Sequence, residues 1–196
     1  ALPSFTVIKI FLPKRKLRIH QPCKQQQAKP KAKLILRKCL ALLDENAYKQ
    51  TMEIAAIILA AGQGSRLKSA LPKPLHRIGG RPMLAWSLDA AIAANASRII
   101  SVLPRQSEKI QDWLDGRDFC IQDKPLGTGH AVQAAASALA EFDGVALIMF
   151  ADTPLVTADT LTRLASSIDA KTCVAVLGFE TAYPQGYGRL VTDSIG

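Results

Sequence analysis

The sequence is poor in the features that mark disulfide-rich, zinc-binding and membrane-spanning proteins. It has four cysteines in 196 residues, scattered and without a C-x-x-C pair, so neither a zinc site nor a disulfide framework is indicated. Its apolar runs are shorter than a bilayer span requires. We therefore expect a cytoplasmic protein with reduced thiols and no membrane partner, long enough for one sizeable domain with or without a tail.

Two common phosphate-binding signatures are also missing. A dinucleotide fingerprint needs G-x-G-x-x-G, but Leu67 stands at the third glycine position of the loop that begins at Gly62. The G-x-x-x-x-G-K-[ST] pattern of a Walker A loop does not occur. No hexapeptide repeat of a β-helix is present either.

Acidic residues are scarce only in the first quarter of the chain. Residues 1–51 carry twelve Lys or Arg and two Asp or Glu, a net charge of +10, whereas residues 52–196 carry thirteen basic and fourteen acidic residues, a net charge of −1. Few aromatics and no apolar period accompany these charges, so we predict a disordered basic extension over 1–51 and a domain over 52–196. A natural start at Met52 is favoured over a targeting or nucleic-acid-binding arm, and a nucleic-acid partner is not expected.

Helical and strand-like segments alternate after Met52. This alternation predicts an α/β fold with a mainly parallel sheet that is covered by helices on both faces. Thr157 is the expected N-cap of the last helix, and both Cys120 and Cys173 are expected in the core. The expected helices are 82–94, 107–114, 129–140 and 158–168, and the expected strands are 54–60, 98–103, 119–121, 144–150 and 172–179.

The loop after the first strand reads LAAGQGSRLKSALPK over residues 59–73. Gly62 and Gly64 lack Cβ, so their backbone can adopt positive φ and bring N–H groups close to phosphate oxygens. Arg66 adds a forked guanidinium, and Lys73 adds a compact ammonium. The loop therefore suits a nucleoside triphosphate, although a surface turn with solvated basic residues explains two glycines equally well.

A second glycine-containing loop links a short strand to a helix and reads QDKPLGTGH from Gln122. Its glycines and the first N–H groups of the helix can donate to a ligand. The Gln122 amide both donates and accepts, so it can read the edge of a base. His130 fits a packed or capping residue better than a catalytic one.

Two further segments carry candidate ligand groups. Asp152 directly follows the most apolar strand, where a carboxylate is costly to desolvate unless it is paired or bound to a cation such as Mg²⁺. A turn aspartate ahead of Pro154 is an equally good explanation. Gly188, in the segment GYGR, allows close backbone approach, although a plain hairpin loop explains it nearly as well.

The segments LAAGQGSRLKSALPKPLHRIGGRPML, IQDKPLGTGHAV, FADTPL and GYGR resemble, in this order, a family of bacterial bifunctional enzymes. These are the N-acetylglucosamine-1-phosphate uridylyltransferase/glucosamine-1-phosphate acetyltransferases, and the likeness covers their N-terminal uridylyltransferase domain. It implies a Rossmann-like nucleotidyltransferase fold. It also implies Mg²⁺-dependent transfer of UMP from UTP to N-acetylglucosamine 1-phosphate, giving pyrophosphate and UDP-N-acetylglucosamine, a precursor of peptidoglycan and lipopolysaccharide.

The resemblance also implies roles for individual residues. Arg66 and Lys73 would hold the triphosphate and stabilise charge at the reacting phosphorus. Asp152 would bind Mg²⁺, and Gly188 would contact the amino sugar. The nucleotide-binding residues would be Leu59, Ala60, Ala61, Gly62, Gly64, Gln122, Gly127 and Thr128.

The family trimerises through a C-terminal β-helix domain that this sequence lacks, and the sequence stops soon after GYGR. The resemblance implies that the later part of the uridylyltransferase domain, which supplies further sugar ligands and a second metal ligand, is also missing, so we expect the chain alone to be an inactive fragment. Two alternatives stay open: a related nucleotidyltransferase with another base or acceptor, and a noncatalytic fragment that binds nucleotide. The extra basic extension could also give the chain a nucleic-acid role.

Overall fold

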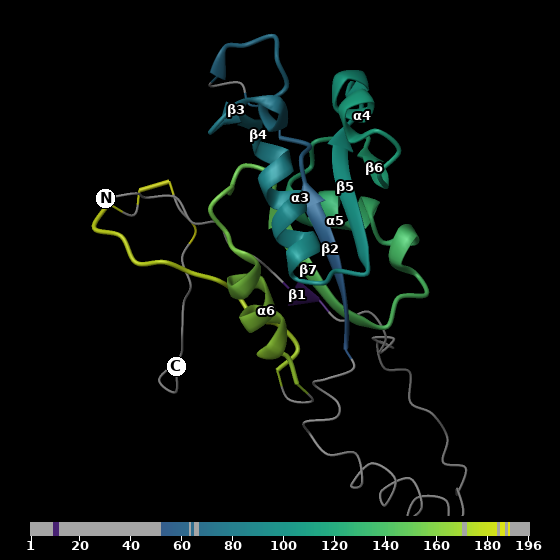
Figure 1. Ribbon diagram of the computed structural model, residues 1–196, viewed down its shortest axis with the longest axis vertical. Coiled ribbons are helices and arrows are strands. Elements are labelled where there is room, and N and C mark those ends of the chain that lie inside the picture. Colours follow the sequence, from purple (N-terminus) through teal and green to yellow (C-terminus); the bar gives the residue numbers. More distant parts are fainter. Residues whose placement is uncertain are drawn as a thin grey trace, which may run out of the picture.

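A five-stranded sheet forms the centre of the molecule in the computed structural model, which describes residues 10–11, 52–62, 64, 67–169, 172–183, 185–186 and 188 (Figure 1). The strand order is β1-β7-β2-β5-β6. Four strands run parallel, and β1 is antiparallel to β7. This architecture confirms the expected α/β class. The bounds are β1 Ile10–Phe11, β2 Glu53–Leu59, β5 Arg98–Pro104, β6 Phe119–Gln122 and β7 Gly144–Phe150.

Helices cover both faces of the sheet because β2 is apolar from Ile54 to Leu59 and β7 carries no polar side chain, so both faces of these strands must be buried. In β2, Ala56 and Ile58 belong to one core cluster, whereas Ala55 and Ile57 belong to the other. The first cluster packs under α3 (Met83–Ala93), α4 (Glu108–Leu114) and α6 (Ala158–Ser166). The second packs under α5 (Thr128–Ala134) and the 3₁₀ turn η3 (Ser137–Leu139), behind the sheet in Figure 1.

A small hairpin follows β2 and packs on α3. The 3₁₀ turn η2 (Lys73–Leu75) leads into β3 (Arg77–Ile78) and β4 (Arg81–Pro82). Gly79 and Gly80, between the two strands, both have positive φ, which a tight hairpin turn requires. Trp86 of α3 donates to the Ile78 carbonyl at 3.0 Å, so the hairpin is fixed to the helix.

The predicted helix starts agree with the structure to within one residue, and at α6 a side-chain cap explains the agreement. Thr157 caps α6, and its hydroxyl accepts from the Thr160 N–H at 3.3 Å. Pro82 directly precedes α3 and Ser107 directly precedes α4. Cys120 lies half-buried in β6, where burial raises the pKa of its thiol.

Two expected elements are wrong in extent or kind. The helix expected over 129–140 ends at Ala134, and its continuation is the 3₁₀ turn η3, because the backbone there tightens to bonds such as Ala136 N–H to Gln133 O. The strand expected over 172–179 is absent except for a single bridge at Val176, and Cys173 is exposed rather than in the core. Apolar composition gives no strand without a neighbouring strand to complete the hydrogen-bond ladder.

The basic extension is described only at Ile10–Phe11. These two residues form β1, with Ile10 opposite Leu147 and Phe11 opposite Ala146, where disorder was expected. The other residues of 1–51 lie outside the described residues. Within the described part of the chain, no helix has the length and apolarity to cross a membrane.

Gly144 provides a test of the β2–β7 pairing. A Cβ at this position would lie 2.2 Å from the Glu53 carbonyl oxygen, which is backbone and has no room to move. We expect Gly144→Ala to lower the free energy of unfolding by about 1–3 kcal/mol, as measured by urea denaturation. Gly129→Ala in α5 is the control, because nothing lies within 4 Å of its Cβ; a loss of equal size there would contradict the explanation.

Candidate functional site

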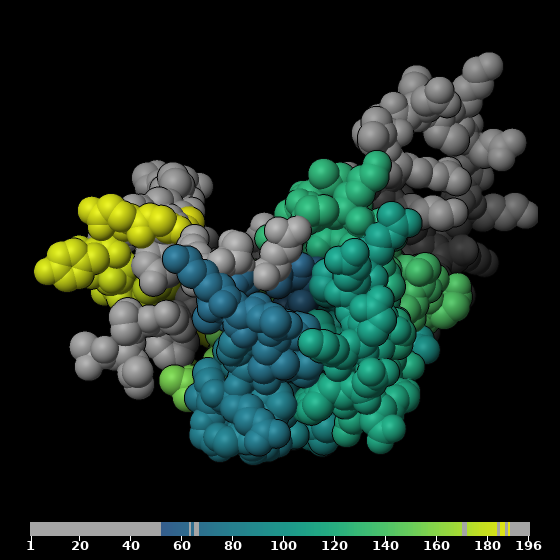
Figure 2. Space-filling view, turned by 90° about the horizontal axis from the view of Figure 1, so that it is seen from above, coloured from purple at the N-terminus to yellow at the C-terminus, as the bar shows by residue number. Residues whose placement is uncertain are grey.

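A cavity of about 360 Å³ opens at the carboxyl ends of β2, β6 and β7. Figure 2 looks down on this edge of the sheet and shows a hollow between blue and green residues. Its size suits a small organic ligand. The lining residues are Leu59, Ala60, Ala61, Gly62, Lys73, Pro74, Gln122, Pro125, Gly127, Thr128, Ala131, Phe150, Ala151 and Asp152.

The strand order explains why the cavity lies here. From β2 the chain passes through α3 to β5 on one side, whereas β7 pairs with β2 on the other side. The connections therefore diverge between β2 and β7, and open α/β sheets bind ligands at such a switch point. The register places Leu59 opposite Phe150, so both strands end at the cavity.

Backbone bonds hold the start of each loop in place. The Ala60 N–H donates to the Val102 carbonyl at 2.8 Å, and the Ala151 N–H donates to the Leu59 carbonyl at 3.1 Å. Both alanines are buried. The resulting wall is apolar and backbone-rich, and it suits the flat face of a base or sugar.

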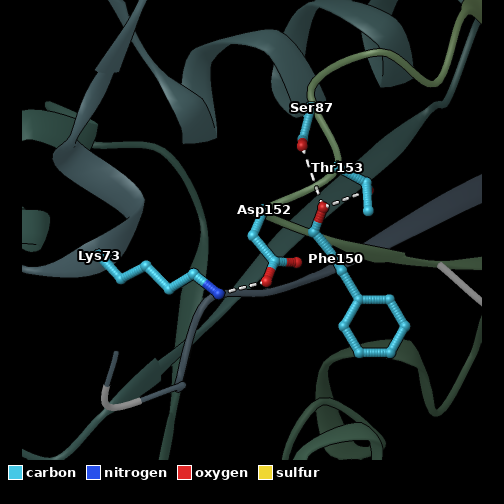
Figure 3. Close-up of polar contacts among 5 residues, drawn as sticks. All are labelled: Lys73, Ser87, Phe150, Asp152 and Thr153. Atoms are coloured by element: carbon cyan, nitrogen blue, oxygen red, sulfur yellow. Dashed lines mark hydrogen bonds and ion pairs between the residues drawn. The ribbon is translucent and has the colours of Figure 1, made fainter. Parts of the chain in front are cut away.

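An ion pair joins two separate segments at the cavity. The Lys73 ammonium in η2 donates to the Asp152 carboxylate after β7 (Figure 3). Their side chains are 33% and 39% exposed, so a ligand can reach both groups. Pro72 and Pro74 flank Lys73 and restrict the backbone that carries it.

Two buried hydroxyl groups fix the turn that carries Asp152. The Ser87 hydroxyl from α3 donates to the Phe150 carbonyl at 3.2 Å, and the Thr153 hydroxyl donates to the same oxygen at 2.8 Å (Figure 3). Both residues are almost fully buried. The last carbonyl of β7 is thereby satisfied, and the turn is tied to α3 next to the carboxylate.

On the other side of the cavity, Gln122 joins the end of β6 to the start of α5. Its amide nitrogen lies 3.1 Å from the Gly127 carbonyl oxygen and 3.2 Å from Nδ1 of His130. Gly127 has a φ of 97°, a conformation that side chains disfavour. The loop that ends at Gly127 is therefore closed by the Gln122 side chain.

Most residues predicted from the loops meet at this cavity. Gly64 does not line it; Gly64 instead packs on Lys73, and a Cβ there would lie 2.7 Å from that of Lys73. Gly188 is exposed and is not among the lining residues, and its segment lies to one side of the cavity in Figure 2. Arg66 lies outside the described residues.

The sequence analysis did not identify the residues that support the site. Ser87 and Thr153 are ordinary helix and turn residues in the sequence, and only their burial reveals their shared acceptor. His130 was expected to pack or to cap a helix. Its contact with Gln122 gives that packing role a definite partner.

A second cavity of about 460 Å³ adjoins the first and shares Lys73 and Gln122 with it. It extends toward the ends of β5 and β6, where Arg105 lies 4.0 Å from Asp123. Together the two cavities can accept a ligand longer than a nucleoside. Both cavities therefore belong to one elongated site.

The donor set at Asp152 suits a hard divalent cation. Among the described residues no group of three His, Cys, Asp or Glu side chains could hold a metal by itself. One carboxylate, already in contact with a cationic group, matches the way Mg²⁺ binds with one or two carboxylates and substrate phosphates. Asp152 therefore fits a metal that arrives with a phosphorylated ligand.

The profile of the MobA-like NTP transferase domain matches residues 56–194. The chain belongs to this family. Bifunctional protein GlmU from Maricaulis maris is 47% identical over 144 residues, which are 72% of this chain and 32% of that protein. This match confirms the resemblance seen in the motifs. The chain spans about a third of the length of the curated relatives it matches.

Solved structures show the same fold. Rv0371c from Mycobacterium tuberculosis aligns with a TM-score of 0.51 and 26% identity, covering 58% of this chain and 59% of that one. A UTP-bound UGPase from Acinetobacter baumannii aligns with a TM-score of 0.51 and 23% identity, covering 59% of this chain and 52% of that one. The family's nucleotidyltransferase fold is thus present in this chain.

The shared acceptor at Phe150 generates a stability prediction. Ser87→Ala or Thr153→Val alone leaves one hydroxyl on the carbonyl beside the Thr153 N–H, which lies 3.3 Å from it, and each should lower the free energy of unfolding by about 1 kcal/mol. The double variant leaves the carbonyl with the long backbone bond from the Thr153 N–H and no hydroxyl, so its loss should exceed the sum of the single losses in urea denaturation.

The control is Ser166→Ala at an exposed position of α6, where the Ser166 hydroxyl donates to the Thr162 carbonyl within the same helix. It should change the free energy of unfolding by less than about 0.5 kcal/mol. Strict additivity of the Ser87 and Thr153 losses would contradict a shared role at the carbonyl.

Proposed function

We propose that this chain carries the nucleotide-binding part of an enzyme that transfers UMP from UTP to N-acetylglucosamine 1-phosphate. The products are UDP-N-acetylglucosamine and pyrophosphate. One observation carries the proposal: the cavity joins the LAAG loop, Lys73, Gln122, the Gly127–Thr128 backbone and Asp152. The identity with GlmU over the same segments supports this choice of substrates.

The groups around the cavity suit the parts of UTP. The apolar backbone wall at Leu59–Gly62 suits the base and ribose, and Gln122 provides polar atoms for the base edge. Lys73 lines the same cavity and provides positive charge for the phosphates. Arg66 follows Gly64 in the same loop and is proposed as a second cation for the triphosphate.

The chemistry needs charge stabilisation and alignment rather than a general base. A phosphate oxygen of the sugar phosphate attacks the α-phosphorus, and the bond to the pyrophosphate leaving group breaks in line with it. The nucleophile is already anionic at neutral pH. Lys73 and Arg66 therefore act by neutralising the negative charge that develops on the phosphoryl oxygens.

Asp152 is the proposed ligand of Mg²⁺. When bound there, Mg²⁺ would supply Lewis-acid stabilisation to phosphate oxygens. The chain's own contribution is to hold the turn that carries the carboxylate, because the Ser87 and Thr153 hydroxyls both donate to the Phe150 carbonyl two residues before Asp152. Gly188 is proposed to contact the sugar through its backbone.

The second candidate is a nucleotidyltransferase of the same family with another base or acceptor. The family match supports this second candidate equally well, because the profile describes NTP transferases in general. Calorimetric titration of the chain with UTP, CTP, ATP and GTP, each with MgCl₂, separates the two candidates. Pyrophosphate release by the complete gene product should require N-acetylglucosamine 1-phosphate, and equal use of glucose 1-phosphate would favour the second candidate.

Asp152→Ala tests the metal ligand. In the complete gene product it should lower kcat by about a hundredfold, because charge stabilisation at the phosphates is lost. It should also raise the Mg²⁺ concentration needed for UTP binding to the chain. Asp159→Ala, at an exposed position of α6, is the control and should leave both quantities unchanged. Unchanged Mg²⁺ dependence in Asp152→Ala would make this residue a turn aspartate only.

Gln122→Ala tests the reading of the base. Removing the amide should reduce the preference of the chain for UTP over CTP by about tenfold, the effect of one good hydrogen-bond pair. The preference is measured as the ratio of the dissociation constants for CTP and UTP. The preference of the wild-type chain is the reference, and a ratio equal to it would remove Gln122 from the proposed base site.

A further inference from the structure

We infer that His130 is a positioning residue that sets base selectivity by fixing which end of the Gln122 amide meets the nucleotide. The inference rests on the proposed function, in which Gln122 contacts the base. His130 is not among the residues that line either cavity, so its effect is exerted through Gln122. The Gly127 carbonyl acts with it as the second anchor.

The chemistry of the two anchors decides how the amide is oriented. A backbone carbonyl oxygen can only accept, so the atom of Gln122 that lies 3.1 Å from the Gly127 oxygen must be the nitrogen. The same nitrogen lies 3.2 Å from Nδ1 of His130. Its two hydrogens are thus matched by two acceptors, provided that Nδ1 carries no proton.

This arrangement also fixes the state of the imidazole. A neutral histidine with an unprotonated Nδ1 carries its hydrogen on Nε2. In the opposite tautomer, an Nδ1–H group would face the amide hydrogens and repel them. His130 therefore holds the amide only as the Nε2–H tautomer.

With its nitrogen occupied, Gln122 has only its amide oxygen left for a ligand. Gln122 is 7% exposed and still lines the cavity, so this oxygen is an acceptor in a largely desolvated site. Uracil presents an N3–H donor at the position where cytosine presents an unprotonated acceptor. A fixed amide oxygen consequently favours uracil, whereas a rotated amide would offer a donor and favour cytosine.

The position of His130 suits this role sterically. It lies in the first turn of α5, three residues after Gly127, so both anchors come from the same helix start. Nδ1 is the ring nitrogen nearer the backbone, and the side-chain oxygen of an asparagine can occupy a similar place. Asn is therefore a conservative replacement that keeps the acceptor, and Leu is one that removes it.

The test measures dissociation constants of UTP and CTP, with MgCl₂, by competition against a fluorescent UTP analogue bound to the 196-residue chain. His130→Leu should reduce the preference for UTP by about fivefold, and His130→Asn should stay within about twofold of wild type. Gln133→Leu is the matched control, because Gln133 is exposed on the same helix; it should leave the preference unchanged.

A second measurement does not need nucleotide. Nitrogen NMR of ¹⁵N-histidine-labelled chain, with His130→Asn to assign the signal, should show the Nε2–H tautomer at His130. The Nδ1–H tautomer would overturn the inference. The inference would also be overturned if His130→Leu kept the wild-type preference for UTP over CTP while Gln122→Ala lost that preference. If Gln122→Ala also keeps the wild-type preference, or the wild-type chain shows none, the proposed base site fails and the inference fails with it.

Discussion

The parallel pairing of β2 with β7 is the constraint on which the rest of the site depends. Seven consecutive residue pairs, from Glu53 opposite Gly144 to Leu59 opposite Phe150, bring two loops together that are about ninety residues apart in the chain. The pairing tolerates no side chain at Gly144, which lies against the Glu53 backbone. Because both strands are buried on both faces, a slip of register would expose apolar residues and empty the core. The ends of the two strands are thus fixed relative to each other by the same ladder that builds the core.

This fixed placement allows charged groups to be held at the edge of an apolar sheet. Lys73 and Asp152 meet across the cavity because η2 and the turn after β7 are each anchored, the first by flanking prolines and the second by the Ser87 and Thr153 hydroxyls. A mobile pair at this exposure would contribute little, because solvent screens it and its side chains lose entropy on pairing. Anchored groups of opposite charge instead present a cation and an anion at fixed positions to a ligand that carries phosphates.

The sequence predicted the parts of the fold that depend on local patterns. Apolar runs correctly predicted four of the five expected strands, and the capping residue Thr157 correctly predicted the start of α6. Sequence-based prediction failed where pairing between distant segments decides whether a strand forms. The apolar run at 172–179 forms only one bridge. Ile10–Phe11, within a charged segment, adds a short antiparallel strand beside β7. At the site, the loops named from their glycines and charges do meet, but the supports at Ser87, Thr153 and His130 have no sequence signature of their own.

The sequence by itself determined the family, the alternation of strands and helices, and the types of chemical group available at each loop. These are properties of residue type and local order, and they survive any arrangement in space. Only the tertiary structure decided which groups touch: that Asp152 pairs with Lys73, that Gly64 makes room for Lys73 rather than lining the cavity, and that the Gln122 nitrogen faces Gly127 and His130. The physical reason is that hydrogen bonds and ion pairs act over a few ångströms, and strand order and register alone bring distant loops within that range.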